Sequence, residues 1–423
     1  MDRIVVHGGR KLTGKLQVQG SKNAVLPMLA ACVLCEGRCT IYNCPAISDV
    51  EDALEIIREL GGKTHRTGSV LVVDARDVCG FEIPKSLMHK MRSSVMFLGP
   101  ILARMGKAFV YTPGGCEIGT RPIDIHIAAM QNIGIAVEQN GDRTDCLLKQ
   151  YCSGEVYLPF PSVGATENIM MAAALGNGTV TVHNAAKEPE IVALQRFINA
   201  MGGNISGAGT DTVQIQGVRR LHSKEYRVPG DRIVCATYLM AVAATGGNAC
   251  FTGVSPGDLQ AILNSMEKMG CTIWADNREI NIKAPEKLCG AGLTETAVFP
   301  GFPTDAQAPF TACAAVADGM TRVVENIFEN RFRHISELCK MGADIRVNGK
   351  NAVICGVPKL YGAKLAAKEL RGAGALVIAG TFAEGTSYVY GTEFLDRGYE
   401  QIEKALSALN ADVIREESNV EKW

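Results

Sequence analysis

The sequence predicts an α/β protein built from six repeated βαβαβ-type units, arranged as two globular domains of three units each. One observation behind this is a phrase that occurs six times: an amphipathic helix, a glycine-containing stop and a short strand. A second phrase, an Ala-rich apolar helix followed by a glycine turn and a strand, alternates with the first. The chain of 423 residues, 47% of them hydrophobic, is long enough for two or three compact domains.

The stops mark the end of each amphipathic helix. Glycine, and less often asparagine, tolerates the left-handed backbone conformation that closes a helix. The stops recur roughly every 70 residues, which is the length of one repeat unit. They are Gly61, Gly134, Gly202, Gly270, Gly342 and Asn410.

The Ala-rich helices are apolar on all sides, so we expect them inside a core and the amphipathic helices outside them. Ahead of the first amphipathic helix, Ser48 and Glu51 have the spacing of a capping box. The apolar phrases, helix and strand together, cover residues 24–42, 95–111, 168–183, 233–251, 308–325 and 375–390.

A stacked solenoid is the alternative arrangement for such repeats. It would need atypical polar units at its ends, whereas the terminal units here keep the common phrase. Two closed halves are therefore preferred, with the break near Pro229 and Gly230.

Charge and composition exclude several kinds of partner. Lysine and arginine number 43 against 44 acidic residues, and this formal charge of −1 gives no field that would attract nucleic acid or an anionic membrane. No apolar stretch reaches the roughly 18 residues of a membrane span, and the N-terminal segment lacks the apolar part of a signal peptide. We therefore expect a soluble, cytoplasmic protein that binds neither nucleic acid nor membrane.

The 15 cysteines fit a reducing compartment rather than a disulfide framework. One group has spacing reminiscent of a metal site, but no second CxxC pair completes it, and most of its members fall in apolar helix and strand phrases. We expect buried thiols and no metal at Cys32, Cys35, Cys39 and Cys44.

The segment PGGCEIGTRPIDIH, residues 113–126, carries the strongest chemical signal. A cysteine is most often a packing residue, but Cys116 stands in a Gly-rich loop with Arg121 close behind it. A neighbouring guanidinium lowers the pKa of a thiol, which makes it reactive.

Basic residues recur at two positions in the repeat. One lies at the start of the apolar helices, where the positive end of a helix dipole favours an anion, and the other precedes the amphipathic helices. Each residue alone would more often be a surface charge, but the recurrence indicates a doubly anionic ligand. The first set is Lys22, beside Asn23, with Arg92, Arg232 and Arg371; the second is Arg121, Arg331 and Arg397.

One acidic residue, Asp305 in FPTDAQAPF, opens the fifth apolar helix. It is either a helix cap or a general base that accepts a proton from an attacking hydroxyl. The residues alone leave both open.

From GSKNAVLP at residue 20 to LDRGYE at residue 395, the chain resembles the enolpyruvyl transferases, in particular those that act on UDP-N-acetylglucosamine. The resemblance implies two inside-out α/β domains that face each other across a cleft. By it, residues 21–229 form the domain with the cysteine loop, and residues 1–20 plus 230–423 form the other. It implies no cofactor and a monomer.

The implied reaction transfers the enolpyruvyl group of phosphoenolpyruvate to the sugar 3′-hydroxyl and releases phosphate, as the first committed step of peptidoglycan synthesis. By resemblance, Cys116 is the general acid or covalent participant and the target of fosfomycin, and Asp305 takes the hydroxyl proton. Lys22, Arg121 and Arg397 bind the phosphate, and Arg331 and Arg371 lie near the carboxylate. The other implied substrate-binding residues are Asn23, Arg92, Pro122, Ile123, Asp124, Ile125, Ser162, Val163, Gly164, Ile327 and Glu369.

Two positions depart from the family's usual pattern. Glu369 stands where aspartate is usual, and Val234 where glutamate is common. These departures leave room for a catalytically impaired paralogue that only binds the nucleotide sugar. The related 5-enolpyruvylshikimate-3-phosphate synthase shares the six-unit plan, but it would not be expected to carry the loop of Cys116.

Overall fold

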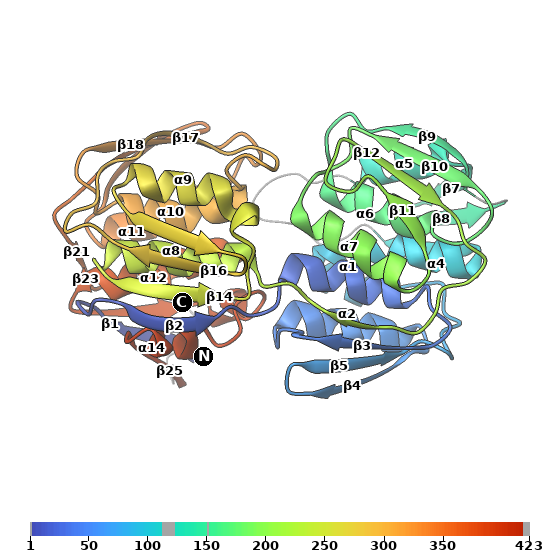
Figure 1. Cartoon of the computed structure of the whole chain (residues 1–423), viewed down its shortest axis with the longest axis horizontal. Helices are drawn as coiled ribbons and strands as arrows, with labels where there is room; N and C mark the ends of the chain where they lie inside the picture. The colour runs from blue at the N-terminus through green and yellow to red at the C-terminus, as the bar shows by residue number, and fades with distance from the viewer. Residues whose placement is uncertain (1, 112–122, 150–151, 418–423) are drawn as a thin grey trace. The chain divides into compact units, whose positions relative to one another are not determined.

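The computed structural model describes residues 2–111, 123–149 and 152–417, which form two compact units (Figure 1). The first unit contains residues 2–19 and 230–417, and the second contains the described residues between 20 and 229. Each unit has its own hydrophobic core.

Six apolar and six amphipathic helices appear where the two phrases predict them. The apolar set is α1 (Lys22–Cys32), α4 (Leu98–Met105), α6 (Val163–Ala172), α8 (Arg232–Ala244), α10 (Gln307–Ala314) and α12 (Leu370–Phe382). The amphipathic set is α2 (Ser48–Glu59), α5 (Asp124–Asn132), α7 (Pro189–Ala200), α9 (Gln260–Lys268), α11 (Ile335–Lys340) and α14 (Ile402–Ala408). Shorter helices are α3 (Lys85–Lys90), η1 (Arg92–Phe97), η2 (Pro256–Leu259), η3 (Thr304–Ala306) and α13 (Thr392–Leu395).

The predicted stops are confirmed, because all six have a positive φ between 71° and 98°. The prediction that the Ala-rich helices are internal is also confirmed: α8, for example, is buried from Arg232 to Ala243. In the first unit α8, α10 and α12 pack against one another, and in the second α4 packs on α6. Small alanine and glycine side chains allow this close contact between helices.

Small sheets surround the apolar helices. The first unit holds β2-β14-β16-β15, β17-β18-β20-β19, β22-β24-β1-β25 and β21-β23, and the second holds β13-β3-β5-β4, β9-β10-β12-β11 and β6-β8-β7. In each four-stranded sheet one outer pair is parallel and the rest are antiparallel. The N-terminal strands pair with strands from the C-terminal half of the chain: β1 with β24 and β25, and β2 with β14.

The strands of the second unit are β3 (Arg38–Tyr42), β4 (Lys63–Thr67), β5 (Val70–Asp74), β6 (Lys107–Tyr111), β7 (Ile135–Asn140), β8 (Arg143–Leu148), β9 (Gly154–Tyr157), β10 (Thr179–His183), β11 (Asn204–Ser206), β12 (Thr212–Gln216) and β13 (Glu225–Arg227). Those of the first unit are β1 (Asp2–His7), β2 (Thr13–Gln17), β14 (Asn248–Thr252), β15 (Thr272–Asp276), β16 (Glu279–Lys283), β17 (Gly292–Glu295), β18 (Met320–Val324), β19 (Asp344–Asn348), β20 (Asn351–Cys355), β21 (Leu360–Tyr361), β22 (Lys364–Ala366), β23 (Ala383–Glu384), β24 (Thr386–Tyr390) and β25 (Asp412–Glu417).

Two local predictions were wrong. The capping box does not form, because α2 begins at Ser48 itself, with Ile47 as its N-cap and no side-chain cap. Helix α1 begins at Lys22 rather than near Ala24, so Lys22 and Asn23 lie inside its first turn.

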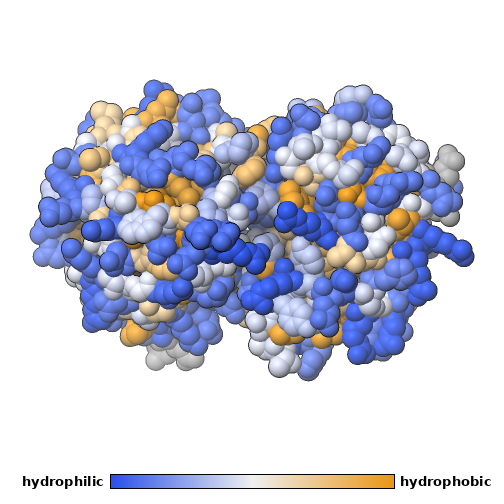
Figure 2. Space-filling view, in the orientation of Figure 1, coloured by the Kyte–Doolittle hydropathy of each residue, from blue (hydrophilic) through white to orange (hydrophobic). Residues whose placement is uncertain are grey.

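Exposed and buried side chains follow the sequence pattern. The face drawn in Figure 2 is mainly hydrophilic, with hydrophobic residues in small separate patches. The four clustered cysteines, Cys32, Cys35, Cys39 and Cys44, are buried, as predicted. Among the described residues no helix is both long and apolar enough to cross a membrane.

Candidate active site

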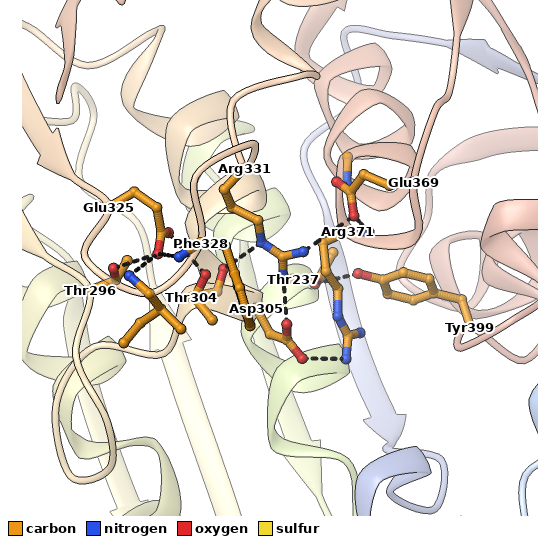
Figure 3. A network of polar contacts seen from close by, with 12 residues as sticks. Thr237, Thr296, Thr304, Asp305, Glu325, Phe328, Arg331, Glu369, Arg371 and Tyr399 are labelled. Carbon is orange, nitrogen blue, oxygen red and sulfur yellow. Dashed lines mark hydrogen bonds and ion pairs between the residues drawn. The ribbon is translucent and has the colours of Figure 1, made fainter. Parts of the chain in front are cut away.

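Four charged residues of the first unit meet at the start of α12. Asp305 lies on η3, Arg331 in the turn before α11, and Glu369 and Arg371 at the beginning of α12. Figure 3 shows the Asp305 carboxylate between the two guanidinium groups, with Arg331 Nη2 at 2.5 Å and Arg371 Nη2 at 3.1 Å. Asp305 is thus not the cap of α10, which was one of its two predicted roles.

The two arginines are almost fully buried, with 2% of each residue exposed, whereas 27% of the Asp305 side chain is exposed. Burial alone would lower the pKa of Arg371, but the charge of Asp305 and the nearby Tyr399 hydroxyl raise it, so the guanidinium stays charged. Arg371 Nη1 has no hydrogen-bond partner among the described residues. A buried, charged donor without a partner is costly and is well placed to bind an anion.

Glu369 is the N-cap of α12. Its carboxylate accepts hydrogen bonds from the backbone N–H groups of Arg371, at 2.9 Å, and Gly372. It also lies 3.5 Å from Arg331 Nη1. Both oxygens are therefore engaged in holding the helix start and Arg331, which leaves Asp305 as the more accessible acid.

Tyr399 supports Arg371 from the side of the protein core. The buried phenol oxygen lies 3.0 Å from Thr237 Oγ1 on α8, and its ring centroid lies 5.9 Å from the Arg371 guanidinium. Since Tyr399 follows Arg397 by two residues, the turn that carries Arg397 is fixed near Arg371. The same turn accepts a hydrogen bond from Gln19 at the carbonyl of Gly398, 3.0 Å away.

In the second unit, Lys22 pairs with a carboxylate that the sequence analysis did not single out. Lys22 Nζ lies 2.6 Å from Asp49 Oδ2, and the Asp49 side chain is only 2% exposed. Asp49 lies in the first turn of α2, where acidic residues are common because they interact favourably with the helix dipole. Its position in the sequence therefore carries no specific signal for a binding site. A buried ammonium next to the first turn of α1 could hold a phosphate or carboxylate.

The predicted segments 123–125 and 162–164 meet at the N-termini of α5 and α6. Ser162 caps α6 by accepting a hydrogen bond from Ala165 N at 3.3 Å. A Cβ on Gly164 would lie 3.0 Å from the His126 ring, so a larger residue there would require the ring to shift. His126 in turn lies 3.0 Å from Asn168 Nδ2. A cavity of about 210 Å³ beside α5 is lined by residues that include Asp124, Ile125 and Tyr157.

Ile327 lies in the loop after β18, where its backbone N–H donates to Glu325. Glu325 is a second carboxylate that sequence reasoning did not select, because an acid after a strand carries no distinctive signal. The predicted residues Cys116, Arg121 and Pro122, and the side chain of Arg92, lie outside the described part of the structure. Lys22, Arg232 and Arg371 lie at the starts of apolar helices, as predicted, whereas the backbone of Arg92 begins the short helix η1, ahead of the apolar helix α4.

No group of three or more His, Cys, Asp or Glu side chains in the described ranges is arranged to hold a metal ion. The cluster in the first unit is made of paired charges, and its two buried arginines are suited to a small anionic substrate. Such a site in an α/β fold of six repeats is typical of the carboxyvinyl transferases.

Comparison with known proteins makes this specific. Residues 6–406 match the family model of EPSP synthase (3-phosphoshikimate 1-carboxyvinyltransferase). UDP-N-acetylglucosamine 1-carboxyvinyltransferase 2 of Caldanaerobacter subterraneus is 46% identical over 415 residues, which are 98% of this chain and 100% of that protein. The UDP-N-acetylglucosamine 1-carboxyvinyltransferase of Desulfosudis oleivorans is 41% identical, over 98% of this chain and 99% of that protein. The chain therefore belongs to the enolpyruvyl transferase family.

Solved structures agree on the fold. The enolpyruvyl transferase NikO from Streptomyces tendae has a TM-score of 0.87 at 23% identity, covering 98% of this chain and 99% of NikO. EPSP synthase from Acinetobacter baumannii has a TM-score of 0.76 at 16% identity, covering 99% of this chain and all of that one. The predicted family and fold class are thereby confirmed.

Proposed function

We propose that this protein is a UDP-N-acetylglucosamine 1-carboxyvinyltransferase. It would transfer the enolpyruvyl group of phosphoenolpyruvate to the 3′-hydroxyl of the sugar and release phosphate, at the start of peptidoglycan synthesis. The structural observation that carries the proposal is the Asp305 carboxylate held between two buried arginines, one of which has an unused donor. Relatives of that name at 41–46% identity over nearly the whole chain support it.

The reaction is an addition followed by an elimination. Protonation of phosphoenolpyruvate at C3 makes C2 electrophilic, and the sugar 3′-oxygen attacks C2 while its proton passes to a base. The C3 proton is then lost, the bond from C2 to the phosphate oxygen breaks, and the enolpyruvyl ether remains. We assign the acid to Cys116 and the base to Asp305.

Binding of phosphoenolpyruvate would also prepare the base. Arg331 and Arg371 both pair with the Asp305 carboxylate. A substrate carboxylate that competes for these guanidiniums weakens that pairing, and a less stabilised carboxylate is a stronger base. Lys22, Arg121 and Arg397 would hold the phosphate, and the helix starts at 123–125 and 162–164 the nucleotide sugar. We expect this chemistry in the cytoplasm, from a monomer.

The test is phosphate release by the purified protein with phosphoenolpyruvate and either of two acceptors. We expect release with UDP-N-acetylglucosamine, together with a product whose mass is that of the enolpyruvyl ether, and none with shikimate 3-phosphate. Release with shikimate 3-phosphate alone would establish the alternative synthase. Binding of the nucleotide sugar by calorimetry without any release would establish the impaired paralogue.

A further inference from the structure

A buried carboxylate outside the reacting groups connects two parts of the first unit. Glu325 follows β18, and Thr296 follows the neighbouring parallel strand β17, so the carboxyl ends of both strands meet at one edge of the sheet. Only 3% of Glu325 is exposed. Four hydrogen-bond donors converge on its side chain (Figure 3).

The two oxygens of Glu325 hold different segments. Oε1 accepts from Thr296 Oγ1 at 2.9 Å and from the backbone N–H groups of Ile327 at 2.8 Å and Phe328 at 3.2 Å. Oε2 accepts from Thr304 Oγ1 at 2.9 Å. One side chain therefore joins the loop after β18 to η3.

Thr304 passes this restraint on to the charged cluster. Its carbonyl oxygen accepts a hydrogen bond from Arg331 Nε at 3.3 Å, and the next residue in the chain is Asp305. The hydroxyl of Thr304 is thus held by Glu325 while its backbone holds Arg331, whose Nη2 pairs with Asp305. Among the described residues no side chain caps the start of η3, where Pro303 is the N-cap.

We propose that Glu325 is a positioning residue that fixes the base Asp305 and the sugar-contacting segment at Ile327 relative to each other. It touches neither substrate and acts through Thr304 on one side and the backbone of the loop on the other. The inference rests on the proposed function, since it takes Asp305 as the base and Ile327 as a contact of the nucleotide sugar.

The Oε2 side is tested by Thr304→Val, which removes the hydroxyl but keeps the shape and the carbonyl. Thr304 is only partly buried, so the variant should fold. We expect kcat to fall about ten-fold, as for the loss of one hydrogen bond to a charged group, with the KM for UDP-N-acetylglucosamine little changed. Thr304→Ser restores the hydroxyl and should restore kcat.

The Oε1 side is tested by Thr296→Val, which removes a hydroxyl that bonds both Glu325 and the backbone N–H of Asn326 at 2.9 Å. This loosens the loop at Ile327, so the KM for UDP-N-acetylglucosamine should rise more than kcat falls. Glu325→Gln should lower kcat, and a matched control is Glu337→Gln on α11. Glu337 is equally buried and accepts a hydrogen bond from Ala366 N at 3.0 Å, but it lies outside the site. The control should therefore keep the parental kcat and KM.

The outcomes separate the two hypotheses. If the parental protein is active and Thr304→Val keeps the parental kcat, or Thr304→Ser is as impaired as Thr304→Val, the role of Glu325 is overturned and the proposed function stands. If the parental protein releases no phosphate with either acceptor, the proposed function fails, and the role of Glu325 fails with it. If Glu325→Gln does not fold, the comparison of Thr304→Val with Thr304→Ser tests the role of Glu325 without it.

Discussion

At the scale of single residues, His334 gives the site region a dependence on pH. Burial, together with the positive charge of Arg331, lowers the pKa of its imidazole to about 3. In the unfolded chain the ordinary value of about 6.5 returns, so the unfolded state binds more protons between these values. The stabilising effect of the neutral imidazole is complete above about pH 6.5 and is lost as the pH falls toward 3.

We therefore expect the free energy of unfolding, measured in urea, to be lower at pH 5 than at pH 7. His334 should account for about 2 kcal/mol of this difference. The variant His334→Leu, which cannot be protonated, should lose that part of the difference. An identical pH dependence in both proteins would show that His334 is not buried in its neutral form.

Glu369 tests whether the longer acid matters. Aspartate is among the preferred N-cap residues and should still cap α12, so Glu369→Asp should fold normally and turn over within a few-fold of the parental rate. Steady-state kinetics of phosphate release measure this. Turnover that falls sharply would mean that the contact of Glu369 with Arg331, at 3.5 Å, needs the extra methylene. Glu369→Ala should lose about 1 kcal/mol of stability with the cap.

At the scale of elements, the stops that end the amphipathic helices make a backbone prediction. Gly134 has a φ of +93° and no atom within 4 Å of the place where a Cβ would stand. Gly134→Ala should therefore lower the free energy of unfolding by about 1–2 kcal/mol through backbone conformation alone. Gly257→Ala is the control, since Gly257 has no positive φ and a Cβ there would meet only Ser255 Oγ at an ordinary contact distance of 3.8 Å, so it should change stability little. Equal stability of the two variants would contradict the role of the stops.

The repeat made the elements predictable. Hydrophobic periodicity and the glycine stops predicted both sets of helices, because each unit repeats the same sequence pattern at the end of a helix and the start of the next strand. Helix starts were less predictable. Ser48 fits a cap by composition, but the chain enters α2 with Ile47 in the extended conformation, so the hydroxyl is one residue too late.

At the scale of the whole molecule, the basic residues and Asp305 could be predicted from the sequence, whereas the carboxylates Asp49 and Glu325 could not. Lys22, Arg331 and Arg371 recur at fixed places in the repeat. Asp49 and Glu325 do not, and only the fold brings them to Lys22 and Thr304. Such pairings join residues distant in the chain, and a single sequence contains no signal for them.

The segments 123–125 and 162–164 and Ile327 are the proposed contacts of the nucleotide sugar. Saturating UDP-N-acetylglucosamine should therefore slow hydrogen exchange at the starts of α5 and α6 and in the loop 325–328. The hairpin β15–β16, which carries no proposed contact, is the reference. Unchanged exchange at the helix starts or in the loop would contradict the assignment of that segment.

The central claim is that Asp305, held between Arg331 and Arg371, takes the proton of the sugar hydroxyl. Asp305→Asn keeps the shape and removes the basicity. The control, Asp145→Asn, disrupts an aspartate that also pairs with an arginine, Arg143 at 2.7 Å, but far from these residues in the chain. Thermal unfolding first establishes the temperature at which both variants are folded, since Asp305 also neutralises buried charge.

The decisive measurement is kcat for phosphate release by Asp305→Asn, with the affinity for UDP-N-acetylglucosamine measured by calorimetry on the same protein. We expect kcat to fall by about a hundred-fold or more while the affinity changes little, and the control to keep the parental kcat. A folded Asp305→Asn protein that turns over at the parental rate would show that another group is the base.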